Sequence, residues 1–217
     1  MFTITVVIAA YNESQNIGSL TERLIQALDS IPDSSWKLIY VIEGNDGTID
    51  LVREFASRRP EIEVYYNEQP SGLANAFRRG FDAVPSDTDF VVTMDADLNH
   101  QPEEIPRLLA ATREFGADIV VGSRRLHGSS FEGAPLWKTA ISRSVNRMTQ
   151  VTMGLRVGDL TSGFRVYRAS ALRRIKFHNT GFAFLPEILV RAAALRMKIV
   201  EQPIVSYFGR LGNRRCA

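Results

Sequence analysis

The pattern of apolar and polar positions predicts strands and helices that alternate through the first half of the chain. Short apolar, β-branched runs at 3–9, 37–42, 62–66, 89–94 and 118–122 are typical of buried strands. Between them, apolar residues recur at helical spacing over 14–28, 46–58, 73–84 and 103–115, and Gly116 closes the last of these helices. We therefore predict one α/β domain, with a mostly parallel central sheet covered by helices on both faces.

The second half has a less regular pattern. The Gly- and Ser-rich stretch 128–133 predicts a flexible loop, and Pro135 opens a helix with apolar residues at near-helical spacing to residue 151. We expect that helix to pack on its own domain, and a membrane-surface helix is the alternative. Further along, a strand is predicted over 161–167, a helix over 184–195 and a last strand over 198–205.

Polar side chains follow three of the predicted strands. These are Tyr11-Asn12-Glu13, residues 43–46, and Asp95-Ala96-Asp97. Because ligands of parallel sheets bind beyond the carboxyl ends of the strands, we expect the three loops to converge on one edge. Carboxylates two residues apart at a strand end project to the same side, under about 7 Å apart, which suits a divalent cation that keeps positions free for phosphate oxygens. The alternative for Asp95 and Asp97 is a solvated acidic turn.

The composition is that of an ordinary globular protein, with 217 residues, 45% hydrophobic and 23% charged. The single cysteine, Cys216, excludes an internal disulfide and fits a reducing, cytoplasmic compartment. The chain enters a strand almost at once, so we expect no signal peptide, and no apolar run approaches the roughly 18 residues of a spanning helix. Binding to a membrane surface remains open.

Charge is distributed unevenly along the chain. Residues 1–105 hold 7 Lys and Arg against 18 Asp and Glu, a balance of −11, and residues 106–217 hold 19 against 6, a balance of +13. An acidic half with metal ligands and a basic half that faces anions would suit a metal-assisted phosphate site. Nucleic acid is not an expected partner, because the arginines are scattered without a nucleic-acid-binding module. The glycine-rich motifs of dinucleotide-binding folds and P-loop enzymes are absent.

An ordered set of motifs gives a specific resemblance. The segments Val-Val-Ile-Ala-Ala-Tyr-Asn-Glu, Glu-Gly-Asn-Asp-Gly-Thr and Met-Asp-Ala-Asp-Leu-Asn-His together resemble family 2 glycosyltransferases of the Rossmann-like GT-A fold. Segments 122–124, 135–138, 141–143, 159–167, 187–189 and 200–204 are similar to the polyprenol- and dolichyl-phosphate mannose synthases within that family. The resemblance extends from about residue 3 to residue 210.

The resemblance implies transfer of a hexose to a polyprenyl or dolichyl monophosphate, with inversion at the anomeric carbon. Mannose is the hexose that it favours, with GDP-mannose as the donor. It implies Mg²⁺ or Mn²⁺ as cofactor, a nucleotide-sugar donor and a lipid monophosphate acceptor. It also implies a peripheral position at the cytoplasmic membrane face, with a membrane-anchoring partner subunit. Residues 1–123 would form the nucleotide- and metal-binding half, and residues 124–217 the acceptor-binding half.

The resemblance also assigns roles to individual residues. The metal ligands would be Asp95, Asp97 and Asn99. The donor pocket would comprise Ala9, Tyr11, Asn12, Glu13, Glu43, Gly72, Leu73, Ala74, Asp95, Ala96 and Arg210. The acceptor phosphate would be bound by Arg124, Lys138, Ser142 and Arg143, and the catalytic residues would be Asp97 and Arg124.

The acceptor can also be argued from chemistry. A phosphate monoester is largely dianionic near neutrality and needs cations to hold it, whereas a hydroxyl acceptor needs a general base. A basic second half favours the phosphate. If the acceptor is instead a saccharide or protein hydroxyl, Asp159 and Glu187 are the candidate bases.

Three further expectations concern single features. The family's second acidic loop is contracted here around Glu43, which leaves open a protein that binds a sugar nucleotide without turnover. Arg165 is expected to form a structural ion pair with Asp159. His100 follows the acidic motif and could approach the metal, but a position that supports the metal loop, or one on the surface, is favoured.

Overall fold

The strand β1 (Phe2–Tyr11) lies inside the sheet because its central residues are apolar toward both faces. Every residue from Ile4 to Ala10 is buried. Ile4, Val6 and Ile8 point into one hydrophobic core, while Val7 and Ala9 point into the other. Such a strand is stable only with a neighbour on each side and helices above and below it.

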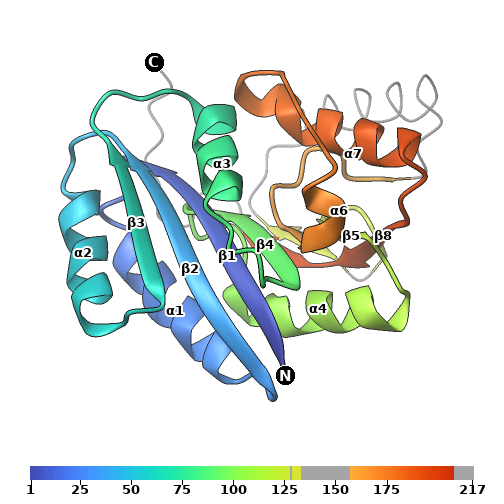
Figure 1. Cartoon of the computed structure of the whole chain (residues 1–217), viewed down its shortest axis with the longest axis horizontal. Helices are drawn as coiled ribbons and strands as arrows, with labels where there is room; N and C mark the ends of the chain where they lie inside the picture. Colours follow the sequence, from blue (N-terminus) through green and yellow to red (C-terminus); the bar gives the residue numbers. More distant parts are fainter. Residues whose placement is uncertain (128, 133–156, 208–217) are drawn as a thin grey trace.

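The computed structural model describes residues 1–127, 129–132 and 157–207, and contains a seven-stranded sheet in the order β3-β2-β1-β4-β7-β5-β8 (Figure 1). The other six strands are β2 (Ser34–Glu43), β3 (Ile62–Asn67), β4 (Phe90–Asp95), β5 (Ile119–Ser123), β7 (Arg165–Arg168) and β8 (Ile199–Pro203). All neighbouring pairs are parallel except those of β7, which runs antiparallel between β4 and β5. The predicted mostly parallel sheet is confirmed.

Helices cover both faces of this sheet, as predicted (Figure 1). On one face lie α1 (Ile17–Asp29), α2 (Thr48–Arg58) and α4 (Ile105–Glu114), the last preceded by the short helix η1 (Pro102–Glu104). On the other face lie α3 (Leu73–Asp82), α6 (Ala169–Leu172) and α7 (Phe184–Ala194), the last preceded by η2 (Gly181–Ala183). Gly116 ends α4 with a left-handed φ of 58°, as expected from its position.

The second half differs from the prediction in three places. β7 begins only at Arg165, and residues 161–164 form a loop instead of strand. The last predicted strand is divided at Ile204 into β8 and β9 (Val205–Tyr207), and β9 leaves the main sheet. Residues 130–132, expected within a loop, form β6 (Ser130–Glu132), which pairs with β9. The helix predicted from Pro135 lies outside the described residues.

Candidate active site

The three polar loops lie side by side at one edge of the sheet, as predicted. Tyr11 at the end of β1 is in register with Glu43 at the end of β2. Ala9 of β1 is in register with Asp95 at the end of β4. Because β2, β1 and β4 are adjacent and parallel, the residues that follow them emerge at the same edge.

The first two loops are fastened to each other by Asn12. Its Oδ1 accepts the backbone N–H of Asn45 at 3.1 Å, and its own backbone is left-handed, with a φ of 53°. Gly44 permits this approach, since a Cβ there would lie 2.1 Å from Asn12 Oδ1. Asn12 therefore shapes the loops, and its predicted contact with the nucleotide stays a prediction.

Glu43 connects the second loop to the start of α3. Its buried carboxylate accepts the N–H and hydroxyl of Ser71, at 3.0 and 2.5 Å, and the N–H of Gly72 at 3.3 Å. The structure thus brings together Glu43 and the turn before Leu73 and Ala74, which the resemblance assigned to one pocket. Sequence reasoning missed Ser71 as the partner of Glu43. The local signal for this contact is the position of Ser71, a hydroxyl residue directly before Gly72 at the start of α3.

Asp46 is a further carboxylate at this edge that the predicted set left out. It accepts the N–H groups of Ser14 and Thr48, both at 3.0 Å, and the Thr48 hydroxyl at 2.5 Å. Burial alone would raise the pKa of Asp46, but these donors outweigh it and lower that pKa. Thr48 in turn accepts the backbone N–H of Glu13 at 2.9 Å, so Asp46 and Thr48 hold the first loop in place.

The acidic loop after β4 has a strained backbone. Leu98, between Asp97 and Asn99, has a φ of 58°, a left-handed conformation that is unfavourable for a bulky residue. In this turn Asp97 accepts the backbone N–H of Asn99 at 3.1 Å and its side-chain amide at 2.7 Å. Asn99 thus orients Asp97, and its assignment as a third metal ligand stays a prediction.

His100 is buried next to this loop. It is 2% exposed, its ring centroid lies 5.3 Å from that of Phe164, and its Nδ1 lies 3.7 Å from Asp95 Oδ2. Burial lowers the pKa of His100, and the nearby Asp95 carboxylate acts against this shift. The expected position near the metal loop is confirmed, and the surface alternative is wrong. Its neighbours Asn99 and Gln101 are polar, so no local pattern indicates that His100 is buried.

Arg124, the predicted phosphate-binding and catalytic arginine, follows β5 and is held by a buried acid. Its Nε and one terminal nitrogen each donate to an Asp159 carboxylate oxygen at 2.7 Å, and that nitrogen also donates to Thr161 Oγ1 at 3.1 Å. The Asp159 side chain is fully buried and that of Arg124 is 23% exposed. Burial would raise the pKa of Asp159, but the ion pair outweighs it and lowers that pKa.

The ion pair expected between Arg165 and Asp159 is therefore wrong. Arg165 is fully buried, and its guanidinium donates to the backbone oxygens of Leu160, Ser162 and Leu185, each at 2.8 Å. Its structural role is as expected, with carbonyls in place of the carboxylate. Of the remaining predicted residues, Lys138, Ser142, Arg143 and Arg210 lie outside the described residues.

Asp95 and Asp97 suit a cation that substrate phosphates help to bind. Mg²⁺ is often bound by one or two carboxylates plus phosphate oxygens, without a complete protein cage. Within the described part of the chain, no cluster of three or more His, Cys, Asp or Glu side chains forms a complete metal site by itself. Gly163 leaves Asp95 room, because a Cβ there would lie 2.9 Å from Asp95 Oδ1. The donor set therefore fits Mg²⁺ or Mn²⁺ bound together with a diphosphate.

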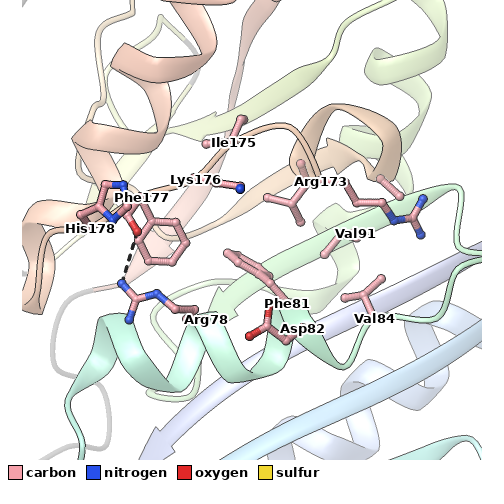
Figure 2. A pocket seen from close by; sticks show the side chains of 12 residues that line it. Arg78, Phe81, Asp82, Val84, Val91, Arg173, Ile175, Lys176, Phe177 and His178 are labelled. Carbon is pink, nitrogen blue, oxygen red and sulfur yellow. Dashed lines mark hydrogen bonds between the residues drawn. The ribbon is translucent and has the colours of Figure 1, made fainter.

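A groove of about 590 Å³ lies between α3 and the segment that follows α6. Figure 2 shows Arg78, Phe81 and Asp82 of α3 facing Ile175, Lys176 and Phe177 across it. None of its lining residues belongs to the predicted site, so the groove is separate from the acidic loops.

None of the helices in the described ranges has the length and apolar character needed to span a membrane.

Comparisons with known proteins show the family to which the chain is similar. The profile of Glycosyl transferase family 2 matches residues 5–176. The undecaprenyl-phosphate mannosyltransferase of Micrococcus luteus is 35% identical over 98% of this chain and 86% of its own length. The polyprenol monophosphomannose synthase of Mycolicibacterium smegmatis is 31% identical over 95% of this chain and 78% of its own. The dolichol-phosphate mannosyltransferase of Pyrococcus furiosus is 32% identical over 92% of this chain and 55% of its own length.

Among solved structures, the glucosyl-3-phosphoglycerate synthase of Mycobacterium tuberculosis shares the fold. Its complex with Mn²⁺, uridine diphosphate and phosphoglyceric acid superposes with a TM-score of 0.72 at 23% identity, over 94% of this chain and 69% of that one. Its complex with Mg²⁺ and uridine diphosphate superposes with a TM-score of 0.71 at 22% identity, over 94% of this chain and 70% of that one. This likeness confirms the predicted GT-A fold.

Proposed function

This chain belongs to glycosyl transferase family 2, and from that premise we propose that it transfers a hexose from a nucleotide-sugar donor to a polyprenyl or dolichyl monophosphate. It is a glycosyltransferase. GDP-mannose is the proposed donor and mannose the transferred sugar, and the reaction inverts the configuration at the anomeric carbon. The names of the three relatives, each a mannosyltransferase or mannose synthase for a lipid phosphate, support this choice.

The proposal of a phosphate acceptor rests on one observation: both candidate bases, Asp159 and Glu187, are engaged in ion pairs and hydrogen bonds within the protein. Asp159 is taken up by Arg124, and Glu187 accepts the backbone N–H groups of His178 and Asn179 and the Arg191 guanidinium. The pKa of each carboxyl is lowered, so each is a weak proton acceptor. A hydroxyl acceptor would need such a base, whereas a phosphate dianion does not.

Each half of the chain then has one task. Residues 1–123 would bind the donor diphosphate, and Asp95, Asp97 and Asn99 are the residues that would hold Mg²⁺ or Mn²⁺. A bound divalent cation would offset the negative charge that develops on the departing nucleotide. Residues 124–217 bind the acceptor, and Arg124, fixed by Asp159, provides a guanidinium for its phosphate. We place the enzyme at the cytoplasmic face of a membrane, associated with its surface or with an anchoring subunit.

Activity assays on the full chain test this proposal. Purified protein would be incubated with Mn²⁺, with GDP-mannose or UDP-glucose, and with a short polyprenyl phosphate or the matched polyprenol. We expect lipid-linked sugar from the phosphate alone. Transfer to the polyprenol or to a saccharide hydroxyl would support the rival acceptor, and donor binding without transfer would indicate a protein without turnover. Either result contradicts the proposal.

Two variants assign the halves separately. Asp97→Ala and Arg124→Ala should each reduce product formation at least about 100-fold, since both remove charge stabilisation worth several kcal/mol. Arg58→Ala on α2 is the control, because Arg58 is exposed and, among the described residues, forms its ion pair with Glu54 one turn earlier. Unchanged rates in both site variants would remove this site assignment.

A further inference from the structure

Two buried polar atoms beside the acidic loop have no hydrogen-bond partner among the described residues. They are His100 Nδ1 and Ser206 Oγ. The two residues face each other across an antiparallel bridge, and Tyr207 donates its N–H to the Asn99 carbonyl at 3.0 Å. β9 therefore holds the loop closed over His100. An unsatisfied buried polar group costs stability, so an apolar side chain would suit this position better if packing were its only role.

Among the described residues, the charged group in contact range of His100 is the Asp95 carboxylate, and the charges of Arg124 and Asp159 also act on the imidazole. Its Nδ1 lies 3.7 Å from Asp95 Oδ2, which exceeds the upper limit of an N–H···O hydrogen bond, roughly 3.2 Å, by about 0.5 Å. The imidazole cannot turn away freely, because it is 2% exposed and packs on the Phe164 ring. A small movement of the Asp95 side chain is thus sufficient to close the gap.

The other Asp95 oxygen lies next to Gly163, where the missing side chain leaves it room. A Cβ at that position would lie 2.9 Å from Asp95 Oδ1. The Gly163 backbone is itself fixed, since its carbonyl accepts the Thr93 hydroxyl at 2.8 Å. The carboxylate of Asp95 therefore sits between a glycine that leaves it space and a histidine nitrogen that faces it.

We propose that His100 is a positioning residue for Asp95: its Nδ1–H donates to Asp95 Oδ2 when a divalent cation binds, and fixes the direction in which the carboxylate faces the cation. Gly163 provides the space for that orientation. This inference rests on the metal role of Asp95 proposed above. Carboxylates that bind metals are commonly held by such outer hydrogen bonds, and loss of one typically weakens metal affinity by about 10- to 100-fold.

The substitution His100→Phe separates this role from simple packing. Phenylalanine preserves the ring that packs on Phe164 and removes the unsatisfied nitrogen. We therefore expect thermal stability to be unchanged or higher, and the affinity for Mn²⁺ in the presence of GDP, or of UDP in a parallel arm, to fall about 10-fold or more. Electron paramagnetic resonance of free Mn²⁺ measures the affinity without any turnover. His100→Asn, whose amide can replace the Nδ1 donor, should restore most of it.

Two further variants complete the design. Gly163→Ala should weaken Mn²⁺ binding from the other side of Asp95, and it tests the proposal even if the His100 variants do not fold. His178→Phe, the same exchange at an exposed position, should leave the affinity unchanged. Equal Mn²⁺ affinity in the wild type and in His100→Phe or Gly163→Ala would overturn this inference alone. No Mn²⁺ binding by the wild type in either nucleotide arm would overturn the metal role as well.

Discussion

At the scale of single residues, Glu187 organises the loop before α7. Its carboxylate accepts the N–H groups of His178 and Asn179 at 3.0 and 2.8 Å, and the Arg191 guanidinium at 2.6 Å. Burial alone would raise the pKa of Glu187, but these donors outweigh it and lower that pKa from 4.5 to about 2. Glu187 is therefore a structural anion, and its sequence-based candidacy as a base loses its support.

This lowered pKa predicts a pH-dependent contribution to stability. Since the folded pKa lies below the unfolded one, the stabilisation is complete above the unfolded pKa and is lost as the pH falls from 4.5 toward about 2. Glu187→Gln should lower the free energy of unfolding by about 1–3 kcal/mol near neutrality. Urea unfolding of both proteins should show this difference shrinking toward pH 3 or so. A difference that is constant with pH would contradict the assignment.

Asp159 provides a second test at this scale. Asp159→Asn removes the charge that fixes Arg124, so we expect the KM for the lipid phosphate to rise about tenfold while the KM for the donor changes little. In an Arg124→Ala background the same substitution should add no further loss, because Asp159 acts through Arg124. A base would behave differently: its loss would lower kcat in both backgrounds and remove the acid limb of the pH profile.

At the scale of elements, the contact between α3 and the sheet depends on Gly80. A Cβ on Gly80 would lie 2.4 Å from Val7 Cγ1, in the middle of a buried face. This close approach allows α3 to lie directly on β1, with its first turn next to Glu43. Because Gly80 has no side chain, α3 can pack closely enough on β1 for its first turn to lie beside the proposed donor pocket.

Gly80→Ala should therefore destabilise the protein although alanine is the better helix former. We expect a loss of about 1–3 kcal/mol from overpacking, larger than the gain of up to about 1 kcal/mol in helix propensity. Gly18 in α1 is the matched control, because a Cβ there meets nothing within 4 Å. Gly18→Ala should leave the stability unchanged or slightly higher. Equal effects of the two substitutions in chemical denaturation would refute the packing explanation.

The elements that the sequence predicts correctly are those with a local signal. Each strand of the first half has its own β-branched run, and its helix has its own apolar stripe, so even the edge shared by Tyr11, Glu43 and Asp95 follows from strand ends. β6 and β9 are three residues each and pair with each other across more than 70 residues, and β9 also bridges to His100. No local pattern can indicate such a pair.

The predicted site divides in the same way. The convergence of the acidic loops was predictable because it needs only topology. The partners of Arg124, Arg165 and His100 were not, because they depend on how the loop at 158–164 folds back on the sheet. Glu201 of β8 fixes that loop by accepting the N–H groups of Gly158 and Asp159, at 2.7 and 3.0 Å. A contact across more than 40 residues leaves no trace in local spacing.

At the scale of the whole molecule, the acidic and basic halves of the chain meet at the candidate site. Burial would lower the pKa of Arg124 in the second half, but the ion pair with Asp159 outweighs it and raises that pKa, and Asp95 of the first half adds to the rise. A cation that binds with a diphosphate and an anion that binds at Arg124 are therefore attracted to adjacent positions. Binding of each should stabilise the folded protein separately.

Thermal unfolding tests this division on the intact chain. A ligand present at about 100 times its Kd stabilises the folded state by about 2.7 kcal/mol, which for a chain of this length raises Tm by roughly 5–10 °C. Mn²⁺ with GDP should produce such a shift in the wild type and in Arg124→Ala, but not in Asp97→Ala. A short polyprenyl phosphate should produce one in Asp97→Ala, but not in Arg124→Ala. If one substitution removed both shifts, the two ligands would share a single binding unit, and the division at residue 123 would be wrong.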